Sequence, residues 1–209
     1  MKYKTEQEQF WSGSFGDEYI DRNADESLVE SNVALFAKIF AHTGSIASIL
    51  EFGANRGLNL QAIKRLLSNT QLSAVEINQS ACNLLVEWGG CVEVFNQSAL
   101  EFEVTQQYEM SFVKGVLIHI NPESLTQVYD ALFNASKRWV LIAEYYNTTP
   151  VEVNYRGHDG RLFKRDFAGE LMDRYPSLKL VDYGFIWHRD PAFPQGDMTW
   201  FLMERVAYL

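Results

Sequence analysis

Carboxylates and glycines occur where the sequence predicts the ends of two buried strands. Glu51 closes the apolar run at 46–52, and Gly53 and Gly57 follow it just before a helical pattern. Glycine lets a backbone approach a ligand closely and adopt positive φ angles, and the start of the next helix offers unpaired N–H groups. Glu76 closes the next apolar run. This combination predicts a small, partly charged ligand resting on the ends of the strands.

Two classes of ligand could use such a loop. A dinucleotide-binding turn reads G-x-G-x-x-G, and started at Gly53 it would need glycine where Asn55 and Leu58 stand. The loop acid-x-G-x-G-x-G, typical of S-adenosylmethionine sites, fits Glu51, Gly53 and Gly57 and departs only at Asn55. A carboxylate at the strand end can hold the ammonium group of S-adenosylmethionine, directly or through water, whereas a dinucleotide gives no reason for it. The loop therefore favours S-adenosyl-L-methionine as the cofactor.

Other strand ends complete the predicted cofactor site. Glu76 can accept hydrogen bonds from both ribose hydroxyls, although a solvated glutamate at a strand end is the alternative. Ser98 lies just past the third predicted strand, where the adenine ring would lie and where an aspartate is common in such sites, so adenine recognition stays open. The full predicted cofactor set is Tyr19, Glu51, Gly53, Ala54, Asn55, Gly57, Glu76, Ile77, Ser98, Ala99, Lys114 and Gly115.

His119 is the candidate catalytic residue. It follows the fourth predicted strand in KGVLIHINP and precedes a helix start, whose N-terminus would lower the pKa of the imidazole and favour its neutral, proton-accepting form. The alternative is a histidine that packs under the loop and bonds a backbone carbonyl. Lys114 and Gly115 are expected to shape the floor under the methionine part of the cofactor, mainly through their backbone.

The stretch 147–165 lacks a clear period and is long for a connection, which is typical of a lid or binding loop. Four basic and two acidic residues lie at 154–166, a local positive excess in a chain of net charge -9. This predicts a pocket for an anionic acceptor, and the alternative is a solvated loop whose arginines pair with nearby carboxylates. The candidate substrate residues are Tyr155, Arg156, His158 and Arg161.

The segment 10–23 combines aromatic, glycine and acidic residues in a way that no simple helix needs. One interpretation is that it folds over the cofactor, with Tyr19 and Asn23 near the site. The other is a packing segment docked by Trp11, Phe15 and Tyr19.

The elements that must position these residues alternate between strand and helix. Apolar runs predict strands, and a 3.6-residue period predicts helices between them. Because βαβ crossovers give a parallel sheet covered on both faces, we predict an α/β fold, a three-layer doubly wound Rossmann-like sheet. Only the loop 189–197 separates the last two strands, so we expect them to pair antiparallel at the end of the sheet. The expected strands are 46–52, 72–77, 91–95, 110–118, 139–146, 179–188 and 199–209, and the expected helices are 27–41, 58–67, 80–88, 121–136 and 166–175.

Length and composition bound the class of protein. The 209 residues favour one domain, 1–209, with a helical cap at 1–45 and a Rossmann-like core at 46–209 that carries the substrate loop. The hydrophobic fraction of 47% is that of a globular chain. The net charge of -9 argues against a nucleic-acid partner, because such proteins present broad basic faces.

Localisation and metal binding are also constrained. No apolar run is long enough to span a bilayer, and the N-terminus lacks the apolar segment of a signal peptide, so we expect a cytoplasmic protein without a membrane partner. Cys82 and Cys91 are expected to be packed thiols. The histidines are scattered without ligand spacing, so no metal is expected.

These residues resemble those of the class I S-adenosylmethionine-dependent methyltransferases. A narrower resemblance, to the pseudaminic acid biosynthesis-associated methylases, covers nearly the whole chain. It implies a methyltransferase acting on a small, anionic sugar or sugar-nucleotide acceptor in surface-glycan biosynthesis, but it does not identify the accepting atom. The segments that carry this resemblance are FWSGSFGDEYIDRN (10–23), LEFGANRGLNL (50–60), VKGVLIHINPE (113–123), PVEVNYRGHDGRLFKRDFAGELMDRYP (150–176) and LVDYGFIWHRDPAFPQGDMTWFLMER (180–205).

Two other functions remain open. One is an NAD(P)-dependent oxidoreductase, which the broken dinucleotide spacing at Asn55 and Leu58 disfavours. The other is a non-catalytic protein that binds the cofactor as a partner of a glycan-assembly enzyme, since this architecture hosts many functions. The sequence does not predict an oligomeric state.

Overall fold

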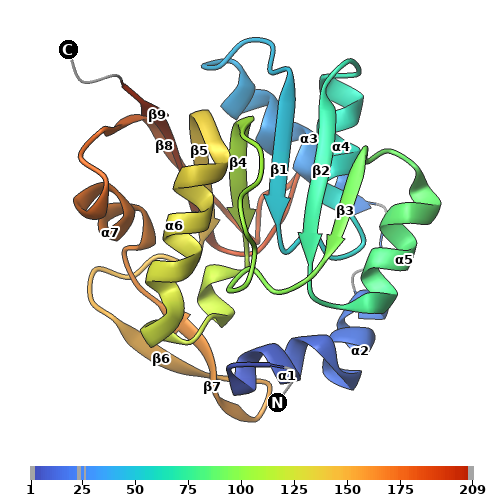
Figure 1. Cartoon of the computed structure of the whole chain (residues 1–209), viewed down its shortest axis with the longest axis vertical. Helices are drawn as coiled ribbons and strands as arrows, with labels where there is room; N and C mark the ends of the chain where they lie inside the picture. Colours follow the sequence, from blue (N-terminus) through green and yellow to red (C-terminus); the bar gives the residue numbers. More distant parts are fainter. Residues whose placement is uncertain (1–2, 23–24, 26, 207–209) are drawn as a thin grey trace.

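A computed structural model of the chain describes residues 3–22, 25 and 27–206. Seven strands form its central sheet, namely β1 (Ser48–Phe52), β2 (Gln71–Glu76), β3 (Glu93–Asn96), β4 (Tyr108–Lys114), β5 (Ser136–Glu144), β8 (Leu178–Ile186) and β9 (Met198–Arg205). Their order is β3-β2-β1-β4-β5-β9-β8 (Figure 1). The first five strands of that order run parallel, and β9 pairs antiparallel with both β5 and β8. The predicted mostly parallel sheet with an antiparallel end is confirmed.

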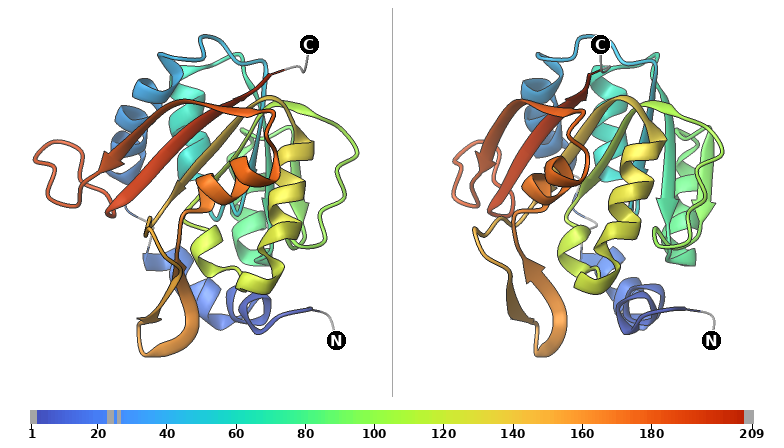
Figure 2. Two further views of the ribbon diagram at one scale, coloured as in Figure 1. Left: turned by 90° about the vertical axis from the view of Figure 1, so that its left-hand side faces the viewer. Right: turned by 60° about the vertical axis from the view of Figure 1, so that its left-hand side comes forward.

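Helices cover both faces of this sheet. The larger helices are α3 (Ser27–Phe40), α4 (Leu58–Leu66), α5 (Gln79–Trp88), α6 (Leu125–Ala135) and α7 (Phe167–Arg174). Helices α3, α4 and α5 share one hydrophobic cluster, while α6 and α7 contribute to a second cluster on the opposite face (Figure 2). The predicted three layers are therefore present.

Strand β1 shows why the strands read as continuous apolar runs. Ile49 and Leu50 are adjacent and both fully buried, but Ile49 belongs to the α3 and α4 cluster and Leu50 to the α6 and α7 cluster. A strand covered on both faces buries every side chain, so alternation with polar residues disappears. The same burial extends to Glu51, which carries a carboxylate into the interior.

The predicted strand 110–118 and helix 121–136 are both shorter than expected. Strand β4 ends at Lys114, because Gly115 takes a φ of 70° and turns the chain into the 3-10 turn η1 (Leu117–His119). A second 3-10 turn, η2 (Pro122–Ser124), follows, and α6 begins only at Leu125. Asn121 caps η2, where its side-chain oxygen accepts a hydrogen bond from the Glu123 N–H.

The prediction that 147–165 is an irregular loop was wrong. It contains the hairpin of β6 (Val151–Tyr155) and β7 (His158–Lys164), whose strands pair antiparallel. The two residues between the strands, Arg156 and Gly157, have φ angles of 52° and 87°. Positive φ at both central residues is what a tight two-residue hairpin turn requires, and arginine at the first position concealed that signal.

The segment before α3 is also helical. It forms α1 (Glu6–Ser12) and α2 (Ser14–Arg22), which lie together at the carboxyl edge of the sheet (Figure 1). The candidate residue Asn23 and the last predicted strand positions, 207–209, lie outside the described residues.

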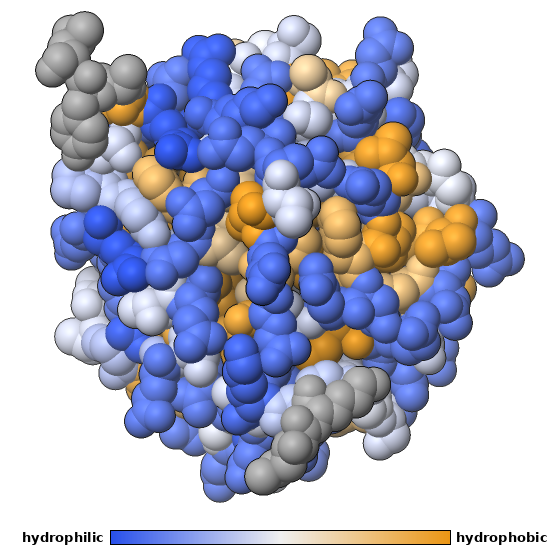
Figure 3. Space-filling model, in the orientation of Figure 1, coloured by the Kyte–Doolittle hydropathy of each residue, from blue (hydrophilic) through white to orange (hydrophobic). Residues whose placement is uncertain are grey.

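Two further properties concern the surface. The face seen in Figure 1 is covered mainly by hydrophilic residues (Figure 3). In the described part of the chain, no helix is long and apolar enough to cross a bilayer.

Candidate active site

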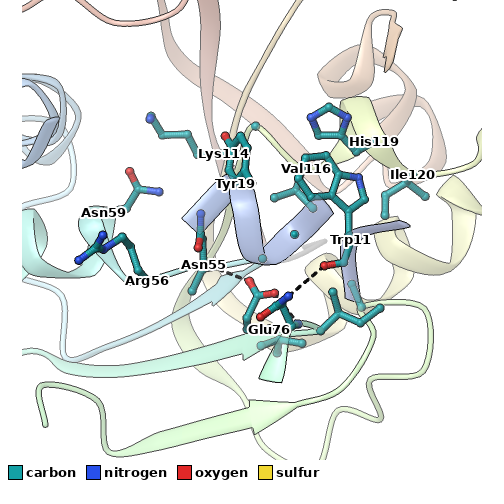
Figure 4. Close-up of a pocket in the computed structure, with 18 of the residues that line it drawn as sticks. Trp11, Tyr19, Asn55, Arg56, Asn59, Glu76, Lys114, Val116, His119 and Ile120 are labelled. Carbon is teal, nitrogen blue, oxygen red and sulfur yellow. Dashed lines mark hydrogen bonds between the residues drawn. The ribbon is translucent and has the colours of Figure 1, made fainter. Parts of the chain in front are cut away.

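A cavity of about 340 Å³ opens at the carboxyl ends of the parallel strands, under α1 and α2. Its walls come from the loops after β1, β2, β3 and β4, from α1 and α2, and from the loop before β9. Figure 4 shows Arg56, Asn59 and Lys114 on one side of this cavity and Trp11 and His119 on the other. Parallel sheets place ligand sites at this edge.

The loop after β1 needs both of its glycines. Gly53 has a φ of 72°, and a Cβ there would lie 2.5 Å from Val116 Cγ2. Gly57 has a φ of 82°, and a Cβ there would lie 2.6 Å from Leu85 Cδ2. Asn55, which departs from the glycine pattern, has a φ of 48°. Asparagine is one of the few residues that tolerate this left-handed region, so the departure preserves the shape of the loop.

Glu76 holds the loops on either side of it. Its Oε2 accepts a hydrogen bond from the Asn55 N–H at 2.7 Å (Figure 4), and its Oε1 accepts one from the Asn78 N–H at 2.8 Å. Burial raises the pKa of its carboxyl group. The alternative of a solvated glutamate is therefore wrong. Each carboxylate oxygen keeps a further lone pair, so Glu76 can fix the loops and still accept from a ligand.

Glu51 lies beneath the cavity wall rather than in it. Its side chain is fully buried, and its Oε1 accepts a hydrogen bond from Asn59 Nδ2 at 2.7 Å. Its Oε2 has no hydrogen-bond partner among the described residues, and burial raises the pKa of this carboxyl group to about 8. Asn59 and Lys114 line the cavity above it. A carboxyl group with this pKa is mostly protonated at neutral pH, so Glu51 acts on the cavity wall through its hydrogen bond with Asn59.

His119 reaches the cavity in a defined tautomer. Its Nδ1 lies 2.6 Å from the Arg161 carbonyl oxygen. A carbonyl only accepts hydrogen bonds, so Nδ1 carries the proton and Nε2 keeps the lone pair. Burial lowers the pKa of the imidazole to about 4, so the ring is neutral at neutral pH. The predicted neutral form is present, but its cause is burial and not a helix N-terminus, and the carbonyl bond offered as the alternative is present as well.

Glu144 positions the loop that carries His119. Its Oε1 accepts hydrogen bonds from the Val116 and Leu117 N–H groups, both at 2.9 Å. The residue ends β5 and is almost fully buried, which raises the pKa of its carboxyl group to about 7. This role could not be predicted from the sequence. Glu144 follows an apolar run in the same way as the other acids at strand ends, and no glycine loop comes after it.

Most of the predicted cofactor residues meet at the cavity. Those that line it are Tyr19, Gly53, Ala54, Asn55, Glu76, Ile77, Ser98, Ala99, Lys114 and Gly115. Glu51 and Gly57 stand behind this lining. Residues that the sequence did not single out also line the cavity, among them Asn59, Gln195 and Met198. Asn59 had a detectable signal, since it lies in the first turn of the helix that follows the glycine loop.

The predicted substrate residues do not line the cavity. Arg156 and His158 line a separate hollow against α1 and α2. Arg161 pairs with Glu6, with 3.2 Å between Nη2 and Oε2, and Tyr155 contacts the His119 ring at a centroid distance of 5.0 Å. The hairpin thus packs against α1 and His119 on the side away from the cavity. Arg161 fits the alternative stated for this segment, in which an arginine pairs with a nearby carboxylate.

Helices α1 and α2 form a roof over the cavity. Gln7 Nε2 donates to the Gly160 carbonyl at 2.8 Å, and Asn78 Nδ2 donates to the Trp11 carbonyl at 3.3 Å and to Asp17 Oδ1 at 3.0 Å. The Trp11 ring lies 4.5 Å from the His119 ring, measured between centroids. The segment therefore folds over the cavity and also packs through its aromatic residues, so both interpretations of 10–23 describe part of it.

Metal and thiol chemistry find little support. In the described ranges, no three His, Cys, Asp or Glu side chains gather as a metal site. Both cysteines are free, and burial raises the pKa of Cys82 to about 11 and that of Cys91 to about 12. Neither thiol is activated as a nucleophile.

The sheet order, the antiparallel last pair and the cavity define the fold of the class I S-adenosylmethionine-dependent methyltransferases. Comparison with protein-family models and with curated protein sequences gives no match. The chain does resemble solved structures in its fold.

Three of these solved structures illustrate the likeness. Magnesium protoporphyrin IX methyltransferase from Synechocystis PCC 6803, with bound S-adenosylmethionine, is 9% identical over 99% of this chain and 100% of that chain, with a TM-score of 0.69. Burkholderia thailandensis 1,6-didemethyltoxoflavin-N1-methyltransferase is 18% identical over 92% of this chain and 86% of that chain, with a TM-score of 0.68. A plantazolicin methyltransferase with S-adenosylhomocysteine is 10% identical over 96% and 94%, with a TM-score of 0.66. At these identities the likeness establishes the fold.

Proposed function

We propose that the chain is an S-adenosylmethionine-dependent methyltransferase that acts on a small molecule. The observation that carries this proposal is the cavity at the carboxyl ends of the strands, floored by the Gly53 to Gly57 loop, whose Asn55 N–H is held by Glu76. The same fold carries S-adenosylmethionine or S-adenosylhomocysteine in solved structures.

The cavity wall offers this cofactor a buried polar atom that has no hydrogen-bond partner. Asn55 lines the cavity, and its Oδ1 is buried without a partner among the described residues; a Cβ at Gly53 would meet Val116, which also lines the cavity. Buried polar atoms of this kind need a partner. Glu76 would hold the ribose hydroxyls, and Asn59 and Lys114 would face the methionine part. When bound, the cofactor supplies a methyl group activated on a sulfonium.

His119 would accept the proton if the acceptor atom is a hydroxyl. Its Nε2 lone pair is available because Nδ1 donates to the Arg161 carbonyl. The proton would pass from the acceptor hydroxyl to Nε2 as the oxygen takes the methyl group, and then to water. General-base assistance of this kind contributes about 10²–10⁴-fold. An amine or carboxylate acceptor would need only the right protonation state.

The finer assignments rest on the sequence. The resemblance to pseudaminic acid-associated methylases supports an anionic sugar or sugar-nucleotide acceptor in a single-domain cytoplasmic enzyme. In the cavity lining, Arg56 and Lys114 are the basic side chains available for an acid group, because Arg156 and Arg161 lie elsewhere.

Calorimetry with S-adenosylmethionine and S-adenosylhomocysteine tests the proposal, with NAD(P) as the control. We expect micromolar binding of both sulfur ligands and none of NAD(P). Binding of NAD(P) alone would establish an oxidoreductase instead. Tight binding without turnover on a panel of sugars, amines and acids would favour a non-catalytic partner of a glycan-assembly enzyme.

The role of His119 is tested separately. We expect His119→Ala to lower turnover by about 10²-fold or more while cofactor affinity changes little. The exposed His42, which pairs with Asp182, provides the matched control His42→Ala. Wild-type turnover in His119→Ala would remove His119 from the mechanism.

A further inference from the structure

We propose that Glu8, on the roof helix α1, recognises the 6-amino group of the cofactor's adenine ring. This inference rests on the proposed function and adds a residue that determines which base the site accepts.

The Glu8 carboxylate is only half used by the protein. Its side chain is buried, with 4% exposure, and its Oε2 accepts hydrogen bonds from the Lys4 and Thr5 N–H groups, both at 2.8 Å. Its Oε1 is buried without a partner among the described residues, and the residue lines the cavity. A buried carboxylate oxygen is costly unless something donates to it. The free oxygen therefore indicates a donor on the ligand.

The start of α1 lies beside the loop where adenine is expected. Lys4 Nζ pairs with Glu101 Oε1 at 3.6 Å, and the Glu101 N–H donates to the Ser98 carbonyl in one turn. That turn contributes Ser98 and Ala99 to the lining. Because Glu8 bonds the backbone of Lys4, its carboxylate lies at this same end of the cavity.

Two other acceptors in the lining already have backbone donors. Ser98 Oγ accepts from the Leu100 N–H at 3.1 Å, and both oxygens of Glu76 accept backbone N–H groups. The acids in the lining are Glu8 and Glu76. Adenine carries its exocyclic donors only on the 6-amino group, and a carboxylate is an acceptor. A purine with hydrogen in place of the 6-amino group would leave Glu8 Oε1 without a donor.

The capping role of Glu8 explains only one of its oxygens. Thr5 and Glu8 form a capping box, in which the Thr5 side chain accepts from the Glu8 N–H and Oε2 of Glu8 returns to the Thr5 N–H. Glutamine serves equally in this motif. In Glu8→Gln the amide oxygen must stay with the Lys4 and Thr5 donors, so the amide NH₂ replaces the free oxygen. The substitution keeps the helix start and converts the acceptor facing the base into a donor.

The test compares two product analogues that differ only at this position, S-adenosylhomocysteine and its analogue with an unsubstituted purine base, which has hydrogen in place of the 6-amino group. We expect the wild type to bind S-adenosylhomocysteine about tenfold or more tightly, because a site built to hydrogen-bond a group rejects the analogue without it. Glu8→Gln should reduce that preference by about tenfold or more. The matched control is Glu6→Gln on the same helix, whose side chain is 80% exposed, and it should keep the wild-type ratio.

Either of two results would overturn the proposal. Equal wild-type affinity for the two analogues would exclude recognition of the 6-amino group whatever the variant does. An unchanged ratio in Glu8→Gln would assign the discrimination to another residue. Failure of the proposed function looks different, since the wild type would then bind neither analogue.

Discussion

Replacing Glu76 by alanine should damage stability and cofactor binding together, in amounts that the structure allows us to estimate. The Asn55 and Asn78 N–H groups would lose their acceptor. A buried donor without a partner costs about 1–3 kcal/mol, so the two together cost about 2–6 kcal/mol of unfolding free energy. In a chain of this size about 1 kcal/mol lowers Tm by roughly 2–4 °C, so we expect Tm to fall by at least about 4 °C.

The effect on binding adds to this. Hydrogen bonds to a charged group are worth about 1.5–3 kcal/mol, so loss of the ribose acceptor should weaken binding of S-adenosylhomocysteine by about 10–150-fold. Thermal melts of the ligand-free protein measure the first effect, and calorimetric titration measures the second. Glu87→Ala, at an exposed position on α5, is the control and should change neither quantity.

The two measurements refute different parts of the reasoning. A lower Tm with unchanged affinity would mean that Glu76 only braces its loops and does not touch the ribose. Weaker binding with an unchanged Tm would mean that the two backbone hydrogen bonds contribute nothing to the ligand-free protein. A variant that matches the wild type in both would mean that the Glu76 carboxylate contributes neither to stability nor to cofactor binding.

Three other substitutions or titrations test the site. Since the pKa of His119 is about 4, its ring should stay neutral on NMR titration from pH 7.5 to 5.5. The free energy of unfolding should fall on acidification between pH 6.5 and 4, because the unfolded chain takes up the proton at a higher pH than the folded protein. A titration midpoint of the ring near pH 6.5 would contradict its burial. Gly53→Ala should destabilise the protein more than Gly44→Ala, because both have positive φ but only a Cβ at Gly53 meets Val116, and equal melting temperatures would refute this contact. Asn55→Gly should weaken binding of S-adenosylhomocysteine less than Asn55→Val, as calorimetry would show, because glycine loses only the side-chain oxygen whereas a β-branched residue also resists a φ of 48°.

What could be predicted from the sequence was local in origin. The buried strands, the glycine loop and the acid at each strand end are encoded in short segments, because a parallel sheet brings consecutive strand ends to one edge. Gly53 and Glu76 could therefore be placed together without knowledge of distant contacts. Glu51 shows the limit, since its position in the chain does not tell whether its carboxylate lines the cavity or lies under Asn59.

What could not be predicted depends on contacts between segments far apart. The roof helix α1 is short, and short helices are marginal without tertiary packing, so its place depends on partners such as Gly160. The hairpin turn at Arg156 and Gly157 lacked the residues usual for its φ angles. The basic residues beside it suggested an anion pocket, but charge alone does not separate an open pocket from an ion pair such as that of Arg161 with Glu6.

The roof has a consequence for the order in which the protein can assemble. Helix α1 leaves the ribosome before the segments that hold it, because its partners include Asn78 and Gly160. Until β7 has been synthesised this short helix has only part of its packing surface, and an isolated turn or two of helix does not persist in water. Residues 5–12 are thus made before these partners and can dock only after them. The nascent chain therefore cannot close its own binding site until translation has passed the hairpin, which makes ligand capture a late event in its biogenesis.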